Sequence, residues 1–159
     1  MLEKKSARLE ELMPLIKEEL DLGRSVRISP RGTSMLPMLR EGKDSVVLSK
    51  IPDRPRKYDV VLYKRANGQY VLHRLVKIGE KYTFLGDNQF DLETGILCEQ
   101  MIAYVSSFYR GGREISGKNI FYKIYCRLWY WTRGVRSLWR RGVNWLRRRV
   151  LKRDGKSKK

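Results

Sequence analysis

Near the N-terminus, apolar residues recur every three or four positions with Glu and Lys between them. This spacing predicts one amphipathic helix over residues 6–22, which lays an apolar stripe on another part of the protein. Pro14 is expected to kink the helix and Gly23 to end it. The stripe consists of Leu9, Leu12, Leu15, Ile16 and Leu20. A single helix cannot form a helix-turn-helix module, which argues against a DNA repressor.

Between about residues 25 and 115 the pattern changes to short β-branched and aromatic runs separated by Gly, Pro, Asp and Asn. The runs are SVRIS, DSVVLS, DVVLYKR, QYVLHRLVKI, KYTFLG and MIAYVSSFYR. Asn67-Gly68 tolerates the positive φ angles of a tight turn, so residues 59–65 and 69–78 are predicted to form an antiparallel hairpin. A further turn continues the meander into KYTFLG. We therefore predict an α+β fold, mainly β, whose body is a mostly antiparallel, twisted β domain.

The pattern becomes helical again after residue 117. Apolar residues share one stripe and Lys or Arg fill much of the rest; the stripe consists of Phe121, Ile124, Leu128, Trp131, Val135, Leu138 and Leu146. We predict one basic amphipathic helix over residues 117–151, followed by a disordered basic end over 152–159. The chain thus divides into an N-terminal helical segment (1–24), a β domain (25–116), the helical tail and the basic end.

Positive charge is concentrated in the same tail. The chain carries a formal net charge of +18, and residues 113–159 hold 16 Lys or Arg against Glu114 and Asp154, which gives them +14. All four Trp also lie there. An apolar face with Trp, flanked by Arg, is typical of a helix in the interface of an anionic membrane, and the recurring arginines argue against a spanning helix. Packing of the stripe against the β domain and binding of nucleic acid are the alternatives.

The two cysteines, Cys98 and Cys126, have neither the spacing of a zinc site nor that of a Cys-x-x-Cys redox motif, so we expect no metal or other cofactor. They fit a reducing compartment. The N-terminus scatters acids among its apolar residues, unlike a signal peptide or a spanning helix. We therefore expect a cytoplasmic protein that is peripheral to the cytoplasmic membrane.

Two residues are candidate catalytic groups. Ser34 follows a predicted strand in the loop GTSMLPML, where Gly permits a sharp turn and Pro fixes the exit of the chain. His73 is the only histidine, and apolar neighbours on both faces of its strand predict a buried imidazole. A serine hydroxyl becomes a nucleophile when a neighbouring base takes its proton, and an imidazole suits that task. Either residue alone is more often a turn or core residue, so the hypothesis depends on their combination.

These residues resemble the motifs of the superfamily of signal peptidase I and LexA-type self-cleaving serine peptidases. The matching boxes run in family order from about residue 29 to residue 109. They are Gly-x-Ser-Met-x-Pro at Gly32, Ser34, Met35 and Pro37, then Asp59-Val60-Val61, His73-Arg74 and Gly86-Asp87-Asn88. Histidine at position 73, where bacterial members have lysine, resembles the archaeal and endoplasmic-reticulum type signal peptidases.

The resemblance implies a serine endopeptidase with Ser34 as nucleophile, His73 as general base and backbone N–H groups near the serine as the oxyanion hole. A carboxylate would orient the imidazole and stabilise its charged form. The resemblance suggests Asp87 for this role, or one of Asp91 and Glu93 just beyond it.

The resemblance also implies a protein or peptide substrate in contact with Met35 and Pro37. We expect no spanning anchor at the N-terminus, and neither a DNA-binding domain nor an evident linker accompanies the β domain, so self-cleavage is disfavoured. Lys64, Arg65 and Arg74 are assigned no role, because charges on a hairpin are usually solvated. Two alternatives stay open: an inactive peptidase-like adaptor on a membrane complex, and a basic nucleic-acid-binding module.

Overall fold

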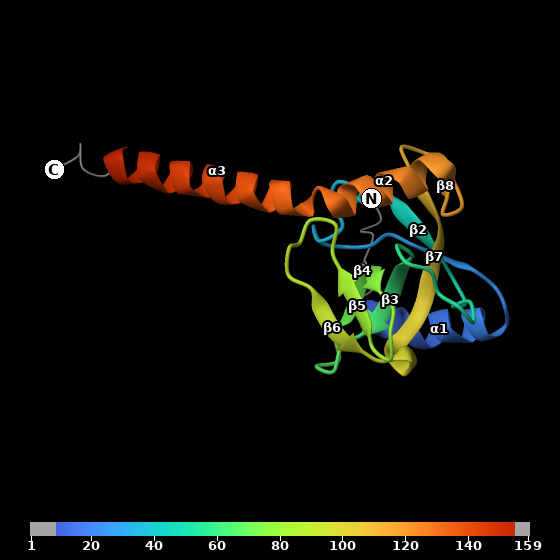
Figure 1. Ribbon diagram of the computed structural model, residues 1–159. Coiled ribbons are helices and arrows are strands. Elements are labelled where there is room, and N and C mark those ends of the chain that lie inside the picture. The colour runs from blue at the N-terminus through green and yellow to red at the C-terminus, as the bar shows by residue number, and fades with distance from the viewer. Residues whose placement is uncertain (1–8, 155–159) are drawn as a thin grey trace.

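The computed structural model describes residues 9–154 and confirms an α+β fold with a mainly β body (Figure 1). The helices are α1 (Leu9–Asp21), the 3-10 turn η1 (Cys98–Gln100), α2 (Ile120–Trp131) and α3 (Arg133–Asp154). The strands are β1 (Val26–Ile28), β2 (Ser45–Ser49), β3 (Val60–Lys64), β4 (Tyr70–Lys77), β5 (Tyr82–Leu85), β6 (Glu93–Ile96), β7 (Met101–Arg110) and β8 (Arg113–Ser116). Residues 6–8 of the predicted first helix and residues 155–159 of the predicted basic end lie outside the described residues.

All strand pairs of the sheet are antiparallel, in the order β1-β2-β7-β3-β4-β5-β6, and β8 pairs with β7. The predicted hairpin is confirmed, since Lys64 lies opposite Tyr70 and Val61 opposite His73 in the β3–β4 register. The predicted continuation of the meander is confirmed by the β4–β5 pair. The hairpin therefore places the only histidine in the middle of a central strand.

The sequence pattern does not predict β6 and β8. Each strand has four residues, and β6 contains Gly95 at φ 82°, a conformation that interrupts a regular alternation. β8 is the segment REIS, with three exposed residues and one half-buried one. Both strands pair with a longer neighbour that is recognisable by itself, so their extended conformation depends on that neighbour more than on their own residues.

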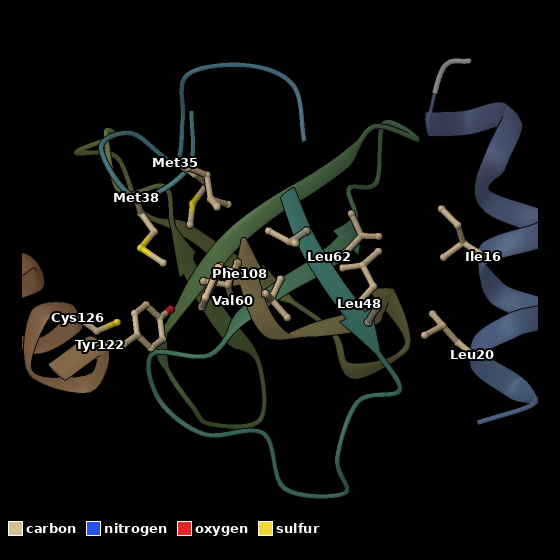
Figure 2. Packing of buried hydrophobic residues seen from close by; sticks show 14 of the residues in the cluster. Ile16, Leu20, Met35, Met38, Leu48, Val60, Leu62, Phe108, Tyr122 and Cys126 are labelled. Carbon is tan, nitrogen blue, oxygen red and sulfur yellow. The ribbon is translucent and has the colours of Figure 1, made fainter. Parts of the chain in front are cut away.

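Two helices cover the larger apolar cluster at opposite ends (Figure 2). Ile16 and Leu20 of α1 reach it from one end, and Tyr122 and Cys126 of α2 reach it from the other. The middle of the cluster comes from the sheet and the β1–β2 loop: Met35, Met38, Leu39, Val46, Leu48, Val60, Leu62, Ala103, Val105 and Phe108. A smaller cluster on the other residues of β3 and β4, joined by Phe84 of β5, includes Val61, Tyr63, Val71 and Leu75. Each strand therefore divides its side chains between two apolar environments.

The helical tail is broken at Thr132 into two helices, where the sequence pattern predicts one. Asn119 caps α2, because its side-chain oxygen accepts hydrogen bonds from the N–H groups of Phe121 and Tyr122. The hydroxyl of Thr132 donates to the carbonyl of Leu128, a bond that competes with the regular helical pattern. α3 then extends far beyond the β body and runs to Asp154, into the segment predicted to be disordered (Figure 1).

The tail leaves most of its apolar side chains in contact with solvent. Of the predicted stripe, Phe121, Ile124, Leu128, Trp131, Val135 and Leu138 are exposed, as is Trp139 beside it; these seven residues are called the exposed apolar stripe below. The two largest exposed fractions, 78% each, belong to Phe121 and Trp131. The alternative in which the whole stripe packs on the β domain therefore fails; the side chain of Leu146 lies outside the described part. Within residues 9–154, no helix combines the length and apolar character needed to cross a bilayer.

Candidate active site

Ser34 lies in the β1–β2 loop, which is held by its own apolar side chains. Gly32 adopts φ 90°, in the left-handed region that glycine enters without strain. Beyond the serine, Met35, Met38 and Leu39 are buried in the larger apolar cluster. Figure 2 shows the two methionines within it. Ser34 itself is half-buried. Burial on one side of the loop thus holds the hydroxyl-bearing residue in a defined place.

A second loop, residues 86–90, supports Ser34 from outside. The N–H of Asn88 donates to the carbonyl of Ser34 at 2.8 Å, and its side-chain amide donates to the carbonyl of Thr33 at 3.2 Å. A Cβ on Gly86 would lie 2.9 Å from the carbonyl oxygen of Ser34, closer than side-chain carbons approach. Glycine at position 86 and asparagine at position 88 therefore have separate structural reasons for their place beside the serine.

Ser34 and His73 line the same cavity, whose volume is about 210 Å³. The structure thus brings together the two residues on which the peptidase hypothesis depends, although 39 positions separate Ser34 and His73 in the chain. Met35, one of the two residues expected to contact the substrate, also lines this cavity. Pro37, the other expected contact, is exposed, follows a cis peptide bond and is not part of the cavity wall. Polar and charged side chains also line the cavity: Arg31, Glu41, Arg65, Gln69 and Gln89.

The imidazole of His73 is buried, with 1% of the residue exposed, and a carboxylate meets it from β6. Nδ1 of His73 lies 3.1 Å from Oε1 of Glu93. The hydroxyl of Tyr63 lies 3.2 Å from the same nitrogen and donates to Oε2 of Glu93 at 2.7 Å. An ionised carboxylate accepts hydrogen bonds only, so Glu93 favours the tautomer with the proton on Nδ1. Nε2 is then the nitrogen free to accept a proton.

Burial controls the protonation of this group. It lowers the pKa of His73 to about 4, and the negative charge of Glu93 opposes that shift only in part. Burial also raises the pKa of Tyr63, with a further rise from its hydrogen bond to Glu93, so the phenol stays a donor. For Glu93, burial would raise the pKa, but hydrogen bonds from Arg65 and Tyr63 outweigh it and the net shift is downward. At neutral pH the site therefore holds a neutral imidazole beside an ionised carboxylate.

Asp87, the first of the three candidate acids, has a different partner. Its two carboxylate oxygens accept hydrogen bonds from Nε and Nη2 of Arg74 at 2.8 and 2.7 Å, and both residues are buried. The reason is the alternation of β4: His73 and Arg74 point to opposite faces of the strand, and Asp87 meets the arginine. Asp91 is exposed. Among the described residues, the carboxylate in contact with the imidazole is Glu93, and Asp87 is corrected to a structural partner of Arg74.

Arg65 and Arg74, to which the sequence pattern assigns no role, are both engaged. Arg65 forms an ion pair with Glu93 and so holds the carboxylate that meets His73. Nothing local in the sequence links Arg65 to Glu93, because they are 28 positions apart and meet only when β6 folds beside β5. Arg74 carries a clearer signal: a cation in the middle of a strand with apolar residues on both sides requires a buried partner.

Comparison of the chain with protein-family models, with curated proteins and with solved structures gives no match in any of the three.

Proposed function

We propose that this protein is a serine endopeptidase with Ser34 as nucleophile, His73 as general base and Glu93 as the carboxylate that orients the imidazole. The observation that carries the proposal is the cavity shared by Ser34 and His73, together with the contact between Nδ1 of the histidine and Glu93. A nucleophile, a base and a group that orients the base form the minimal set for acyl transfer. The resemblance of the sequence to signal peptidase and LexA-type serine peptidases supports the same reaction class.

The reaction follows from the protonation states of the site. The Oγ of Ser34 attacks the scissile carbonyl carbon as its proton passes to Nε2 of His73, and the carbonyl π pair becomes an oxyanion. Glu93 stabilises the imidazolium, which then protonates the leaving amine as the C–N bond breaks and an acyl-Ser34 ester remains. A water molecule attacks this ester while His73 takes its proton, and the proton returns to Ser34 as the ester bond breaks.

The nucleophile loop offers donors for the oxyanion. Within residues 9–154, the backbone N–H groups of Ser34 and Met35 donate to no backbone or side-chain oxygen, whereas the next N–H, that of Leu36, donates to Thr33 at 3.2 Å. Backbone donors that need no reorganisation are the usual means of stabilising a tetrahedral oxyanion. The two free donors adjoin the nucleophile in sequence, which supports acyl transfer at this loop.

A covalent probe tests the chemistry. The full-length protein is treated with a fluorophosphonate probe, the modified residue is located by mass spectrometry, and cleavage of a peptide library is followed in parallel. We expect labelling at Ser34 and peptide cleavage, both lost in Ser34→Ala and in His73→Ala. Ser29→Ala, which changes an exposed serine ahead of the same loop, is the matched control. A folded wild-type protein with neither labelling nor cleavage would favour the adaptor alternative.

We further propose that the tail attaches the protein to an anionic membrane surface. The exposed apolar stripe supports this, because aromatic and aliphatic side chains on one helical face, with many Lys and Arg around them, suit the headgroup region of a bilayer. Full burial of a Leu side chain contributes about 1.5–3 kcal/mol. Leu138→Asp should therefore weaken sedimentation with phosphatidylserine-containing vesicles about ten-fold or more.

Leu22→Asp is the matched control for this binding test, because Leu22 is 60% exposed at the end of α1 and Leu138 is 67% exposed. The two variants introduce the same charge in place of the same side chain. Neutral vesicles and single-stranded RNA complete the comparison. Tight binding to RNA together with indifference to anionic vesicles would replace the membrane proposal with the nucleic-acid alternative.

A further inference from the structure

Side chains from both tail helices donate to the backbone of the 86–90 loop. Nε1 of Trp129 donates to the carbonyl of Asp87 at 2.8 Å, and Nη1 of Arg136 donates to the same oxygen at 3.3 Å. Nη1 of Arg140 donates to the carbonyl of Asn88 at 3.1 Å. The guanidinium of Arg136 also stacks on the ring of Trp129, 3.6 Å from its centre. The tail therefore holds two neighbouring carbonyls of this loop. Both α2 and α3 donate to that of Asp87, and α3 also donates to that of Asn88.

One peptide group of that loop faces both the tail and the nucleophile. The carbonyl of Asp87 and the N–H of Asn88 belong to the same planar peptide unit. Its oxygen accepts from Trp129 and Arg136, while its N–H donates to the carbonyl of Ser34 at 2.8 Å. Because the unit is rigid, a shift at its oxygen also moves its N–H, and donors on the oxygen polarise the N–H bond.

The side chain of Asp87 also helps to hold this peptide in place. Its carboxylate is bound by Arg74, and Nη1 of that arginine donates to the hydroxyl of Tyr122 at 2.8 Å and lies 2.9 Å from Sγ of Cys126. Tyr122 and Cys126 are the buried residues of α2. The tail thus contacts Asp87 through its backbone and, by way of Arg74, through its side chain.

We infer that Trp129 and Arg136 are positioning residues for Ser34, so that the tail is part of the scaffold of the active site as well as the proposed membrane anchor. They lie on a different face of the tail from the exposed apolar stripe and act through the 87–88 peptide. This inference rests on the proposed function for its kinetic consequence. Its structural consequence, the state of the hydrogen bond between the Asn88 N–H and Ser34, does not depend on activity.

The test replaces donors and keeps the bulk of each side chain. Trp129→Phe removes the Nε1 donor, Arg136→Gln removes the guanidinium, and Arg140→Gln removes an exposed donor whose loss does not disturb the core. Tyr130→Phe and Arg127→Gln are matched controls on α2, because the one removes a hydroxyl and the other a guanidinium, and among the described residues neither group forms a hydrogen bond with the 86–90 loop.

The first measurement is amide hydrogen exchange of Asn88 in the full-length protein. We expect exchange to be about ten-fold faster in Trp129→Phe, which corresponds to about 1.4 kcal/mol of local stabilisation lost with the hydrogen bond. Arg136→Gln and Arg140→Gln should accelerate it as well, and the two control variants should not. Exchange at the wild-type rate in all three test variants overturns the inference.

The second measurement is the rate of probe labelling at Ser34 as a function of pH. We expect the plateau rate of Trp129→Phe to fall about 10- to 100-fold, because small displacements of a reacting group are costly. The midpoint of the acid limb should stay at the wild-type pH, since His73 and Glu93 are untouched. A shifted midpoint, or an equal fall in Tyr130→Phe, contradicts a positioning role. If the wild-type protein fails to label but Asn88 exchange is faster in the three test variants, the proposed function is overturned and the positioning inference stands.

Discussion

Replacement of Glu93 by glutamine tests the assignment of the site most directly. The variant keeps the size of the side chain but removes the charge beside Nδ1 of His73, which lies 3.1 Å from Oε1. A glutamine amide also offers N–H donors, and a donor facing Nδ1 favours the tautomer with the proton on Nε2. That tautomer has no lone pair on Nε2 to take the proton of Ser34. Two effects, lost charge and wrong tautomer, therefore act in the same direction.

The size of the effect follows from these contacts. A hydrogen bond to a charged group contributes about 1.5–3 kcal/mol, and about 1.4 kcal/mol corresponds to a ten-fold change in rate. Loss of the charge alone thus predicts a fall of about 10- to 100-fold. In a fully buried triad, inversion of the tautomer lowers kcat by about 10⁴-fold. Because Tyr63 also lies within 3.2 Å of Nδ1 and retains part of the orientation, we expect a fall of about 10²- to 10³-fold in Glu93→Gln.

The assay is the second-order rate of Ser34 labelling, or of peptide cleavage once a substrate is found, at neutral pH. Asp91→Asn is the control, because Asp91 is an exposed carboxylate two positions before Glu93. It removes the same charge two positions before the strand without touching the imidazole, so its rate should equal that of the wild type. A Glu93→Gln rate above a tenth of the wild-type rate would refute the orienting role. Equal losses in both variants would show that Glu93 acts by long-range electrostatics alone.

Three further predictions concern stability and the supporting loop. The pKa of His73 is about 4 in the folded protein and 6.5 when unperturbed, so between these pH values the unfolded state binds a proton that the folded state does not. Lowering the pH from 6.5 to 4 should therefore reduce the free energy of unfolding by about 3 kcal/mol, and His73→Asn should not show this loss. Asp87→Asn should lower the free energy of unfolding by about 3–5 kcal/mol in urea titrations, because it leaves Arg74 buried without its counter-charge; a loss below 1 kcal/mol would contradict that pairing. Gly86→Ala should reduce probe labelling at least ten-fold, since its Cβ would lie 2.9 Å from a carbonyl of the nucleophile loop, whereas Gly79→Ala, with its nearest contact at 3.6 Å, should not.

Most of the body is predictable from the sequence because its signals are local. Asn67-Gly68 identifies the β3–β4 hairpin by turn chemistry alone, and the alternation of residues along β4 is enough to assign His73 and Arg74 to opposite faces. The same local reasoning fails for β6, whose four residues become a strand by pairing with β5. Glu93 lies in that strand, so the acid of the site could not be chosen from three nearby carboxylates without the pairing.

The break in the tail is hidden for a related reason. The apolar period continues from α2 into α3, and Thr132 carries no strong helix-ending signal, so the sequence indicates one helix. Periodicity also finds the apolar stripe but says little about the rest of the helix surface, where Trp129 and Arg136 bind a backbone oxygen. Contacts to backbone carbonyls leave no pattern in the residues contacted, and tertiary structure alone reveals them.

The alternation of one strand explains how the site and its scaffold are separated and yet coupled. His73 faces Glu93 and the cavity, whereas its neighbour Arg74 faces Asp87 and α2. A shift of β4 along its own axis would move both side chains together, so the ion pair between Arg74 and the 86–90 loop also fixes His73, the proposed base. The His-Arg pair and the Gly-Asp-Asn box therefore hold one another in place, and each residue of the pair makes its contacts on a different face of the strand.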